Sequence, residues 1–135
     1  MPLISVAIPT HRRLPMFESV FTQTFVDWEI VVSDDETPSG EAWSFLNSLA
    51  RADARIRAIK NDGPHGAVSN HNLALRASCG EWIKPLHDDD VLKPNCLEVV
   101  ARIVSQDLAT DNEESASGSN VPVCDLIEPA PVPAV

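Results

Sequence analysis

The sequence predicts an α/β domain in which a parallel sheet is covered by helices. Short aliphatic runs alternate, along residues 1–104, with segments whose apolar residues recur at helical spacing. The aliphatic runs are continuously apolar, as expected of strands buried on both faces of a parallel sheet. Strands and helices that alternate in this order form parallel sheets with helical connections.

Each expected element has its own signal in the chain. Apolar runs bounded by turn residues predict strands at about residues 3–8, 28–33, 56–59 and 81–86. Helical spacing predicts helices at about residues 15–24, 41–51 and 67–78. A last helix is expected from Pro94, because proline is a favoured first helical residue. Ser39 is the expected N-cap of the second helix, and Gly80 is expected just past the end of the third.

Length and composition limit the class of protein. The 135 residues, 44% of them hydrophobic, suffice for one domain with a core. No run of about 18 apolar residues encodes a transmembrane helix, and the N-terminus lacks the pattern of a signal peptide. The three cysteines, Cys79, Cys96 and Cys124, have no metal-type spacing. We therefore expect reduced thiols in a cytoplasmic protein.

The net charge of −10 is concentrated toward the C-terminus. Residues 105–135 hold six acidic and no basic side chains, which leaves a net charge of −4 for residues 1–104. An acidic chain is unsuited to nucleic acid, which binds basic surfaces. The last residues are also rich in proline. We therefore expect a domain at residues 1–104, followed by an acidic, Pro-rich and disordered tail at residues 105–135.

Polar residues follow three of the expected strands directly. The residues at these strand ends are Pro9 and Thr10, Asp34 and Asp35, and Asp88, Asp89 and Asp90. Because ligands bind beyond the carboxyl ends of parallel strands, we expect these side chains to lie close together. Carboxylates suit Mg²⁺ or Mn²⁺, and Mg²⁺ is usually held by one or two carboxylates together with substrate phosphates. The pattern favours a metal–diphosphate site, with a solvated polar turn as the alternative for each cluster.

Five motifs, in order along the chain, are similar to those of one known family. They are residues 5–10, residues 23–35, Asn61 and Gly63 with residues 70–72, residues 80–84, and residues 87–94. In this register the chain resembles the N-terminal, nucleotide-sugar-binding half of the inverting glycosyltransferases of family 2. That family has the Rossmann-like GT-A fold, so the resemblance implies a truncated, parallel-sheet half of a GT-A domain.

The resemblance assigns the nucleotide to the ends of the first two strands. It places Pro9 and Thr10 beside the base. It gives Asp35 the role of accepting a hydrogen bond from the N–H of a uracil-type base, with Asp34 as the other member of the pair. Asn72 matches a helix position near the donor sugar nucleotide.

The resemblance assigns the diphosphate and its metal to the acidic run after the fourth strand. Asp90 is the implied ligand of Mg²⁺ or Mn²⁺, and Asp89 contacts the ribose or supports the metal. Asp88 completes a D-x-D pattern with Asp90. A metal there stabilises the departing phosphate as a Lewis acid. His71 stands where many relatives have Trp or Arg, so the chain departs from the family pattern at that contact.

The implied activity is metal-dependent transfer of a sugar from a UDP-sugar to a saccharide, lipid or protein acceptor. Such a protein acts in the cytoplasm or at the inner face of the membrane, in the synthesis of cell-envelope polysaccharide. The family's general base lies in the second half of the domain, and residues 105–135 offer no match to it. The alternatives are a nucleotide-sugar-binding fragment without transferase activity, or an unproductive fragment whose open sheet edge favours self-association.

Three further groups of residues have a functional and a structural interpretation. The spacing of His65, His71 and His87 is unlike that of zinc sites, so we expect polar histidines that bind no metal. Core packing rather than sugar stacking is expected of Trp28, Trp43 and Trp82. Two interpretations stay open for Arg12 and Arg13: their side chains approach the diphosphate, or they are exposed on a loop.

Overall fold

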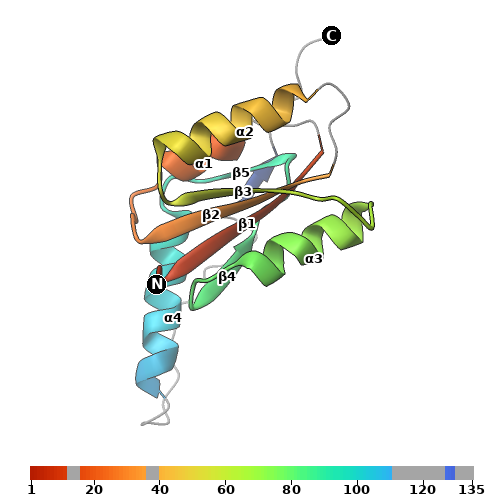
Figure 1. The fold of residues 1–135 in the computed structure, drawn as a ribbon. Helices are drawn as coiled ribbons and strands as arrows, with labels where there is room; N and C mark the ends of the chain where they lie inside the picture. Colours follow the sequence, from red (N-terminus) through yellow and green to blue (C-terminus); the bar gives the residue numbers. More distant parts are fainter. Residues whose placement is uncertain (12–15, 36–39, 111–126, 130–135) are drawn as a thin grey trace.

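The four main strands form one parallel sheet in the order β3-β2-β1-β4 (Figure 1). The strands are β1 (Ile4–Thr10), β2 (Trp28–Asp34), β3 (Ile56–Lys60) and β4 (Trp82–Pro85). This computed structural model describes residues 1–11, 16–35, 40–110 and 127–129. The parallel pairing confirms the α/β prediction, and each strand coincides with one of the aliphatic runs.

The two central strands are paired along their whole length. Ile4 of β1 is opposite Trp28 of β2, and Thr10 is opposite Asp34 at the other end. Every residue of β2 is buried, as expected for a strand that has a neighbour on each side and helices on both faces. The polar ends of β1 and β2 therefore meet at the same edge of the sheet.

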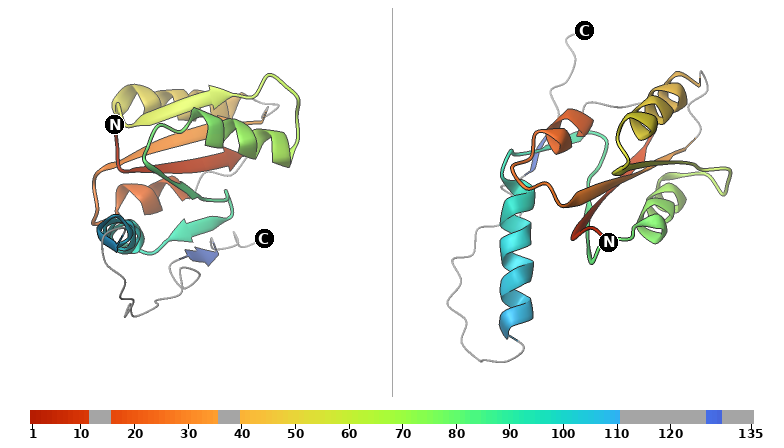
Figure 2. Two further views of the ribbon diagram at one scale, coloured as in Figure 1. Left: turned by 90° about the horizontal axis from the view of Figure 1, so that it is seen from below. Right: turned by 60° about the vertical axis from the view of Figure 1, so that its left-hand side comes forward.

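Helices cover both faces of the sheet. They are α1 (Met16–Phe21), α2 (Glu41–Ala52), α3 (Ala67–Ala77) and α4 (Cys96–Thr110). Figure 2 shows α3 on the face opposite to α1 and α2. The main core lies between the sheet and α1, α2 and α4, where Val6, Phe17, Leu46 and Leu97 are almost fully buried. None of the described helices has the length and apolar character needed to cross a membrane.

Two helices begin differently from expectation. The N-cap residue of α2 is Gly40, in a left-handed conformation (φ 68°) without a side-chain cap. Ser39, the expected cap, lies outside the described residues. α4 begins at Cys96 rather than Pro94, because a turn comes first in which the Cys96 N–H donates to the Lys93 carbonyl at 2.9 Å. The helix then continues past residue 104, the expected end of the domain.

Gly80 has a different role from that of a helix end. Ser78 caps α3 with an extended backbone, and Gly80 lies against β1. A Cβ atom at residue 80 would be 2.6 Å from the backbone nitrogen of Ser5 and 3.0 Å from the carbonyl carbon of Ile4. Glycine is needed here because the chain entering β4 passes too close to β1 for a side chain.

β4 is the outermost strand on one side of the sheet, and its outer edge has no strand partner among the described residues. Trp82 is 37% exposed and Ile83 is 43% exposed. The expectation that Trp82 lies in the core is wrong, because this strand has a neighbour on one side only. Trp28, by contrast, is buried on β2, and the Arg55 guanidinium carbon lies 3.9 Å from the centre of its ring.

A second, two-stranded sheet joins segments that are far apart in the sequence. β5 (Asp90–Leu92) pairs antiparallel with β6 (Ile127–Pro129). The expected tail thus includes a short strand at residues 127–129, and residues 111–126 and 130–135 lie outside the described chain. Proline is tolerated in this place because β6 is an edge strand and Pro129 is its last residue.

Candidate functional site

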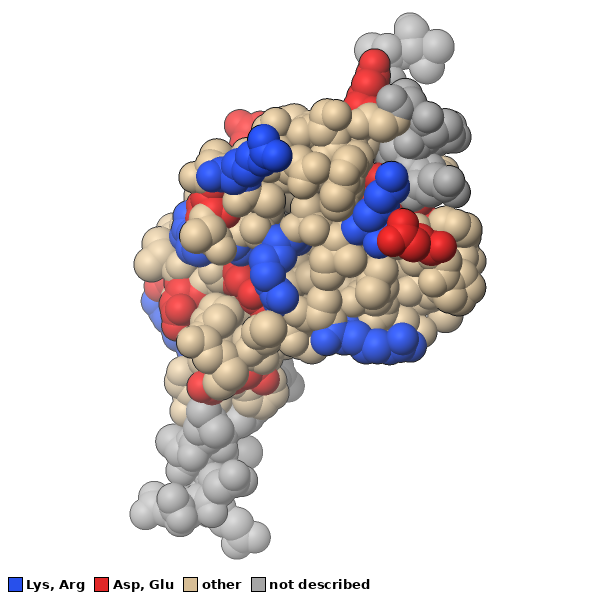
Figure 3. All heavy atoms as spheres, in the orientation of Figure 1, with Lys and Arg blue, Asp and Glu red and all other residues tan. Residues whose placement is uncertain are grey.

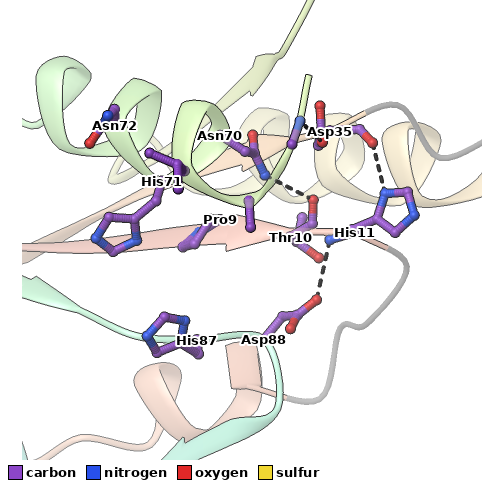
Figure 4. Close-up of a pocket in the computed structure, with 12 residues that line it drawn as sticks. Pro9, Thr10, His11, Asp35, Asn70, His71, Asn72, His87 and Asp88 are labelled. Atoms are coloured by element: carbon purple, nitrogen blue, oxygen red, sulfur yellow. Dashed lines mark hydrogen bonds between the residues drawn. The ribbon is translucent and has the colours of Figure 1, made fainter. Parts of the chain in front are cut away.

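A cavity of about 650 Å³ opens beyond the carboxyl end of β1 (Figure 4). α3 forms one wall, and the loop between β4 and β5 forms the other. The cavity is lined by Pro9, Thr10, His11, Asp35, Gly66, Ala67, Val68, Asn70, His71, Asn72, His87 and Asp88. Its position agrees with the expectation that ligands of an open α/β sheet bind beyond the carboxyl ends of the strands, and its volume suits a small molecule.

The Asp35 carboxylate, directly after β2, is held by three donors of the protein. Oδ1 accepts from the Asn61 side chain at 2.9 Å and lies 2.8 Å from Nδ1 of His65, while Oδ2 accepts from the Gly66 N–H at 2.9 Å. Burial opposes the negative charge. The Gly66 N–H, the His65 ring and the Asn61 amide outweigh it and hold the pKa of Asp35 below its usual value. Asp35 is therefore an ionised acceptor with room for one more donor.

Asn70 fixes α3 to the ends of the two central strands. Its side-chain nitrogen donates to the Thr10 carbonyl at 3.2 Å and to the Ser33 carbonyl at 3.0 Å. Asn70 is 3% exposed, so its side chain is part of the packed interior and not of the surface. The signal in the sequence was its spacing from Ala74, because residues four apart lie on the same face of a helix and Ala74 is buried.

His11 connects two sides of the pocket. Its backbone N–H donates to Oδ2 of Asp88 at 3.2 Å, and its Nδ1 lies 2.8 Å from the Asp35 carbonyl oxygen (Figure 4). A carbonyl oxygen can only accept, so Nδ1 carries the proton of this bond. Sequence reasoning missed His11, whose only signal was its place directly after β1.

Two further histidines, which sequence reasoning did not assign to a binding site, face each other at the pocket. His71 comes from α3 and His87 from the loop after β4, and their rings are stacked at 5.8 Å with an angle of 15° between the planes. The Nδ1 atom of His71 is buried and has no hydrogen-bond partner among the described residues. The two rings line opposite walls of the pocket.

Five of the eight site residues predicted from the sequence lie at the pocket wall: Pro9, Thr10, Asp35, Asn72 and Asp88. The other three do not line it. Asp34 is 1% exposed because consecutive residues at a strand end point to opposite sides. Asp89 is exposed, and Asp90 begins β5 after a turn closed by its N–H and the His87 carbonyl.

The acidic groups at the pocket fit a metal only in part. Among the described residues there is no group of three or more His, Cys, Asp or Glu side chains that could hold a metal ion. Asp88 is the one carboxylate of the run at residues 88–90 that reaches the pocket wall. This donor set fits Mg²⁺ or Mn²⁺ held by one carboxylate and by oxygens of a diphosphate and water, and it does not form an all-protein cage. Arg12 and Arg13 lie outside the described residues.

The sequence model of the family described as "Glycosyl transferase family 2" matches residues 5–112, which include every residue of the pocket. The chain belongs to glycosyl transferase family 2. The family assignment made from the five motifs is confirmed, and the match extends along α4 beyond residue 104.

Glycosyltransferases of bacteria are among the relatives of this family 2 chain. It is 34% identical over 117 residues to the GalNAc(5)-diNAcBac-PP-undecaprenol beta-1,3-glucosyltransferase of Campylobacter jejuni, covering 81% of this chain and 37% of that protein. It is 31% identical over 101 residues to the UDP-Glc:alpha-D-GlcNAc-diphosphoundecaprenol beta-1,3-glucosyltransferase WfgD of Escherichia coli, covering 72% and 39%. The chain thus spans less than two fifths of either relative.

Solved structures of glycosyltransferases share the fold. Residues 1–349 of Staphylococcus aureus TarS in complex with UDP superpose with a TM-score of 0.66 at 19% identity, covering 86% of this chain and 38% of that one. The mannosyltransferase PcManGT of Pyrobaculum calidifontis, in complex with GDP-Man and Mn²⁺, superposes with a TM-score of 0.61 at 20% identity, covering 74% and 32%. The predicted GT-A half domain is therefore confirmed as the fold.

Proposed function

We propose that this chain binds a nucleotide-sugar, most simply a UDP-sugar, as the donor-binding part of a glycosyltransferase. The observation that carries the proposal is the Asp35 carboxylate, which is ionised, held by three protein donors, and open to one more donor at the pocket. The names of the relatives support it, since one enzyme is named for UDP-Glc and TarS has been solved with UDP.

The base and the diphosphate would use different walls of the pocket. Asp35 would accept the N3–H of uracil, which selects uracil over cytosine because cytosine has no hydrogen at that nitrogen. Thr10 and Pro9 would flank the base at the end of β1. Asn72 and His71, on α3, would face the diphosphate and the sugar. A divalent metal bound at Asp88 would neutralise charge on the departing diphosphate.

The metal ligand is proposed to be Asp88, with Asp90 and Asp89 as the other candidates from the same run. Asp88 is favoured because it lies at the pocket wall, whereas Asp90 begins β5. PcManGT, which shares the fold, has been solved with Mn²⁺, and this supports a metal in the present chain. Both Mg²⁺ and Mn²⁺ bind hard oxygen ligands, so either ion suits the proposed site.

Sugar transfer also needs a general base and an acceptor site, and we assign neither among the described residues. A second candidate function is therefore nucleotide-sugar binding without transfer. It is favoured by the pocket, whose lining carboxylates, Asp35 and Asp88, are both used in donor binding in our proposal. The undecaprenol-linked acceptors in the names of two relatives support action at the cytoplasmic face of a membrane. An assay of donor hydrolysis and transfer distinguishes the two functions.

The test is a calorimetric titration of UDP into the chain with and without Mn²⁺. We expect binding that is strengthened by Mn²⁺. The variant Asp35→Ala should weaken it at least about tenfold under both conditions, because the base loses its acceptor. CDP should bind about tenfold or more weakly than UDP for the same reason.

Three acidic variants and one control locate the metal. Asp88→Ala should remove the effect of Mn²⁺ while leaving metal-free binding of UDP unchanged. Asp89→Ala and Asp90→Ala should retain the effect of Mn²⁺. Glu81→Gln changes an exposed carboxylate at the opposite end of β4 and should bind like the wild type. A folded chain that gives no heat with UDP contradicts the proposal. Loss of the Mn²⁺ effect in Asp90→Ala alone moves the metal to the residue predicted from the sequence.

A further inference from the structure

We propose that His11 is a positioning residue that holds the Asp88 carboxylate at the pocket. The inference rests on the proposed donor site and adds to it a connection between the β2 end and the loop after β4. The imidazole ring of His11 is anchored on the Asp35 carbonyl, and the backbone N–H of the same residue then points at Asp88.

The bond from His11 is what restrains Asp88. Within the described parts of the chain, the His11 N–H at 3.2 Å is the one hydrogen-bond donor to the Asp88 carboxylate. Residues 11 and 88 are 77 positions apart, so no local turn fixes their geometry. The β1–β4 ladder ends before this point, at the bond from the Leu86 N–H to the Ala7 carbonyl. The turn closed by the Asp90 N–H and the His87 carbonyl restrains the Asp88 backbone, and the direction of the Asp88 carboxylate depends on where residue 11 holds its N–H.

The side chain of His11 determines that direction. Its Nδ1–H donates to the Asp35 carbonyl at 2.8 Å, and the Asp35 N–H donates to the Thr10 carbonyl at 3.0 Å. Together these two bonds tie the chain after β1 to the chain after β2. If the side chain at residue 11 lacks a donor, only the bond from the Asp35 N–H to the Thr10 carbonyl remains. The backbone at residue 11 is then free to rotate away from Asp88.

Three variants separate the bond from the volume of the ring. His11→Phe keeps a ring but has no donor. His11→Asn restores a donor nitrogen bonded to Cγ, as Nδ1 is in histidine. Asp88→Ala removes the acceptor. Hydrogen exchange of the residue 11 amide should be slowed about tenfold or more in the wild type. This protection should be lost in His11→Phe and in Asp88→Ala, and it should return in His11→Asn.

A double-mutant cycle tests whether His11 acts through Asp88. His11→Phe should weaken UDP binding in the presence of Mn²⁺ about five- to tenfold, and it should have no further effect in the Asp88→Ala chain. Equal protection of the residue 11 amide in the wild type and in His11→Phe overturns the inference, as does additivity in the cycle. A chain that shows the predicted protection pattern but binds no UDP refutes the proposed donor site and leaves the connection between His11 and Asp88 standing.

Discussion

Glu29 on β2 and Asp35 directly after it are both ionised, but they have different roles. Asp35 faces the pocket, whereas Glu29 lies near the start of the strand, where it is 8% exposed. Glu29 accepts from the Ser5 hydroxyl at 2.5 Å and from the Cys79 N–H at 2.7 Å, and it pairs with Arg57 at 3.2 Å. Burial opposes its charge, but these partners outweigh burial and lower the pKa of Glu29.

The first prediction concerns the contribution of Glu29 to stability. Because its pKa is lower in the folded chain than in the unfolded chain, ionised Glu29 stabilises the fold at pH values above its unfolded pKa, about 4.3. That contribution is lost as the pH falls through the folded pKa. Glu29→Gln should therefore lower the free energy of unfolding by about 1–3 kcal/mol at pH 7, and by less at pH 3. Urea unfolding of both chains across this range measures the difference.

Glu18→Gln provides the matched control, because Glu18 is an exposed glutamate on α1. It should change stability little at either pH. A destabilisation by Glu29→Gln that is the same at pH 7 and pH 3 would show that the charge of Glu29 does not stabilise the fold.

The residues of the pocket differ in how far they can be predicted from the sequence. Thr10 ends β1, Asp35 directly follows β2 and Asp88 is three residues beyond β4. Because parallel strand ends converge, the approach of these residues was predictable. His11 and Asn70 act through partners that are 77 and 60 positions away. Such contacts depend on the exact register of three elements, which local patterns do not specify.

At the scale of the elements, the entry into β4 is packed closely against β1. Gly80 has no room for a Cβ, and its N–H donates to the Ser5 hydroxyl at 2.7 Å. Gly80→Ala should force the start of β4 away from β1 and cost about 1–3 kcal/mol of stability, as overpacking does. Hydrogen exchange should accelerate at the Trp82 and Leu86 amides, which donate to the Leu3 and Ala7 carbonyls.

Gly40→Ala separates the clash at Gly80 from the general cost of replacing a glycine. Gly40 has φ 68° and open space around a Cβ, so this variant carries only a backbone cost, about 1 kcal/mol. It should leave the exchange of the β4 amides unchanged. Unchanged exchange of these amides in Gly80→Ala would mean that β1 and β4 have more space between them than we describe.

The elements themselves were predictable to the extent that packing agreed with local pattern. β1 and β2 are aliphatic runs that are covered on both faces of the sheet. The apolar sequence pattern therefore agrees with the buried position of these strands. β6 was not predictable, because Ile127–Pro129 is short and its pairing depends on the free edge of β5. The exposure of Trp82 was also missed, because a sequence does not reveal which strand is outermost.

At the scale of the whole molecule, the outer edge of β4 has no strand partner among the described residues. Ile83 is 43% exposed there, and unpaired edge strands favour association with another chain. We predict that sedimentation velocity shows a mass that rises with concentration and that Ile83→Lys reduces this rise. Val26→Lys, at a residue that is 69% exposed but outside the strands, is the control. Monomers at every concentration, or equal effects of both variants, would contradict the prediction.

The charge distribution on one face of the molecule is consistent with a small charged ligand rather than a large anionic one. On the face shown in Figure 3, separate basic and acidic side chains are spaced over uncharged surface, without a continuous basic patch. Among the described residues, three arginines are engaged in ion pairs, Arg55 with Asp53, Arg57 with Glu29 and Arg102 with Glu98. In the proposed donor site, recognition of the diphosphate would therefore depend on groups inside the pocket, namely His71 and a metal bound at Asp88.

Backbone amide NMR is the most direct test of whether the cavity beyond β1 binds a nucleoside diphosphate. UDP with Mg²⁺ should shift the amide signals of Thr10, His11, Asp35, Gly66 and His87, all at the pocket wall. Replacing Mg²⁺ by Mn²⁺ should broaden the signals nearest Asp88 first. Signals that stay in place in a folded chain, or shifts confined to α4 and the outer edge of β4, would contradict the claim.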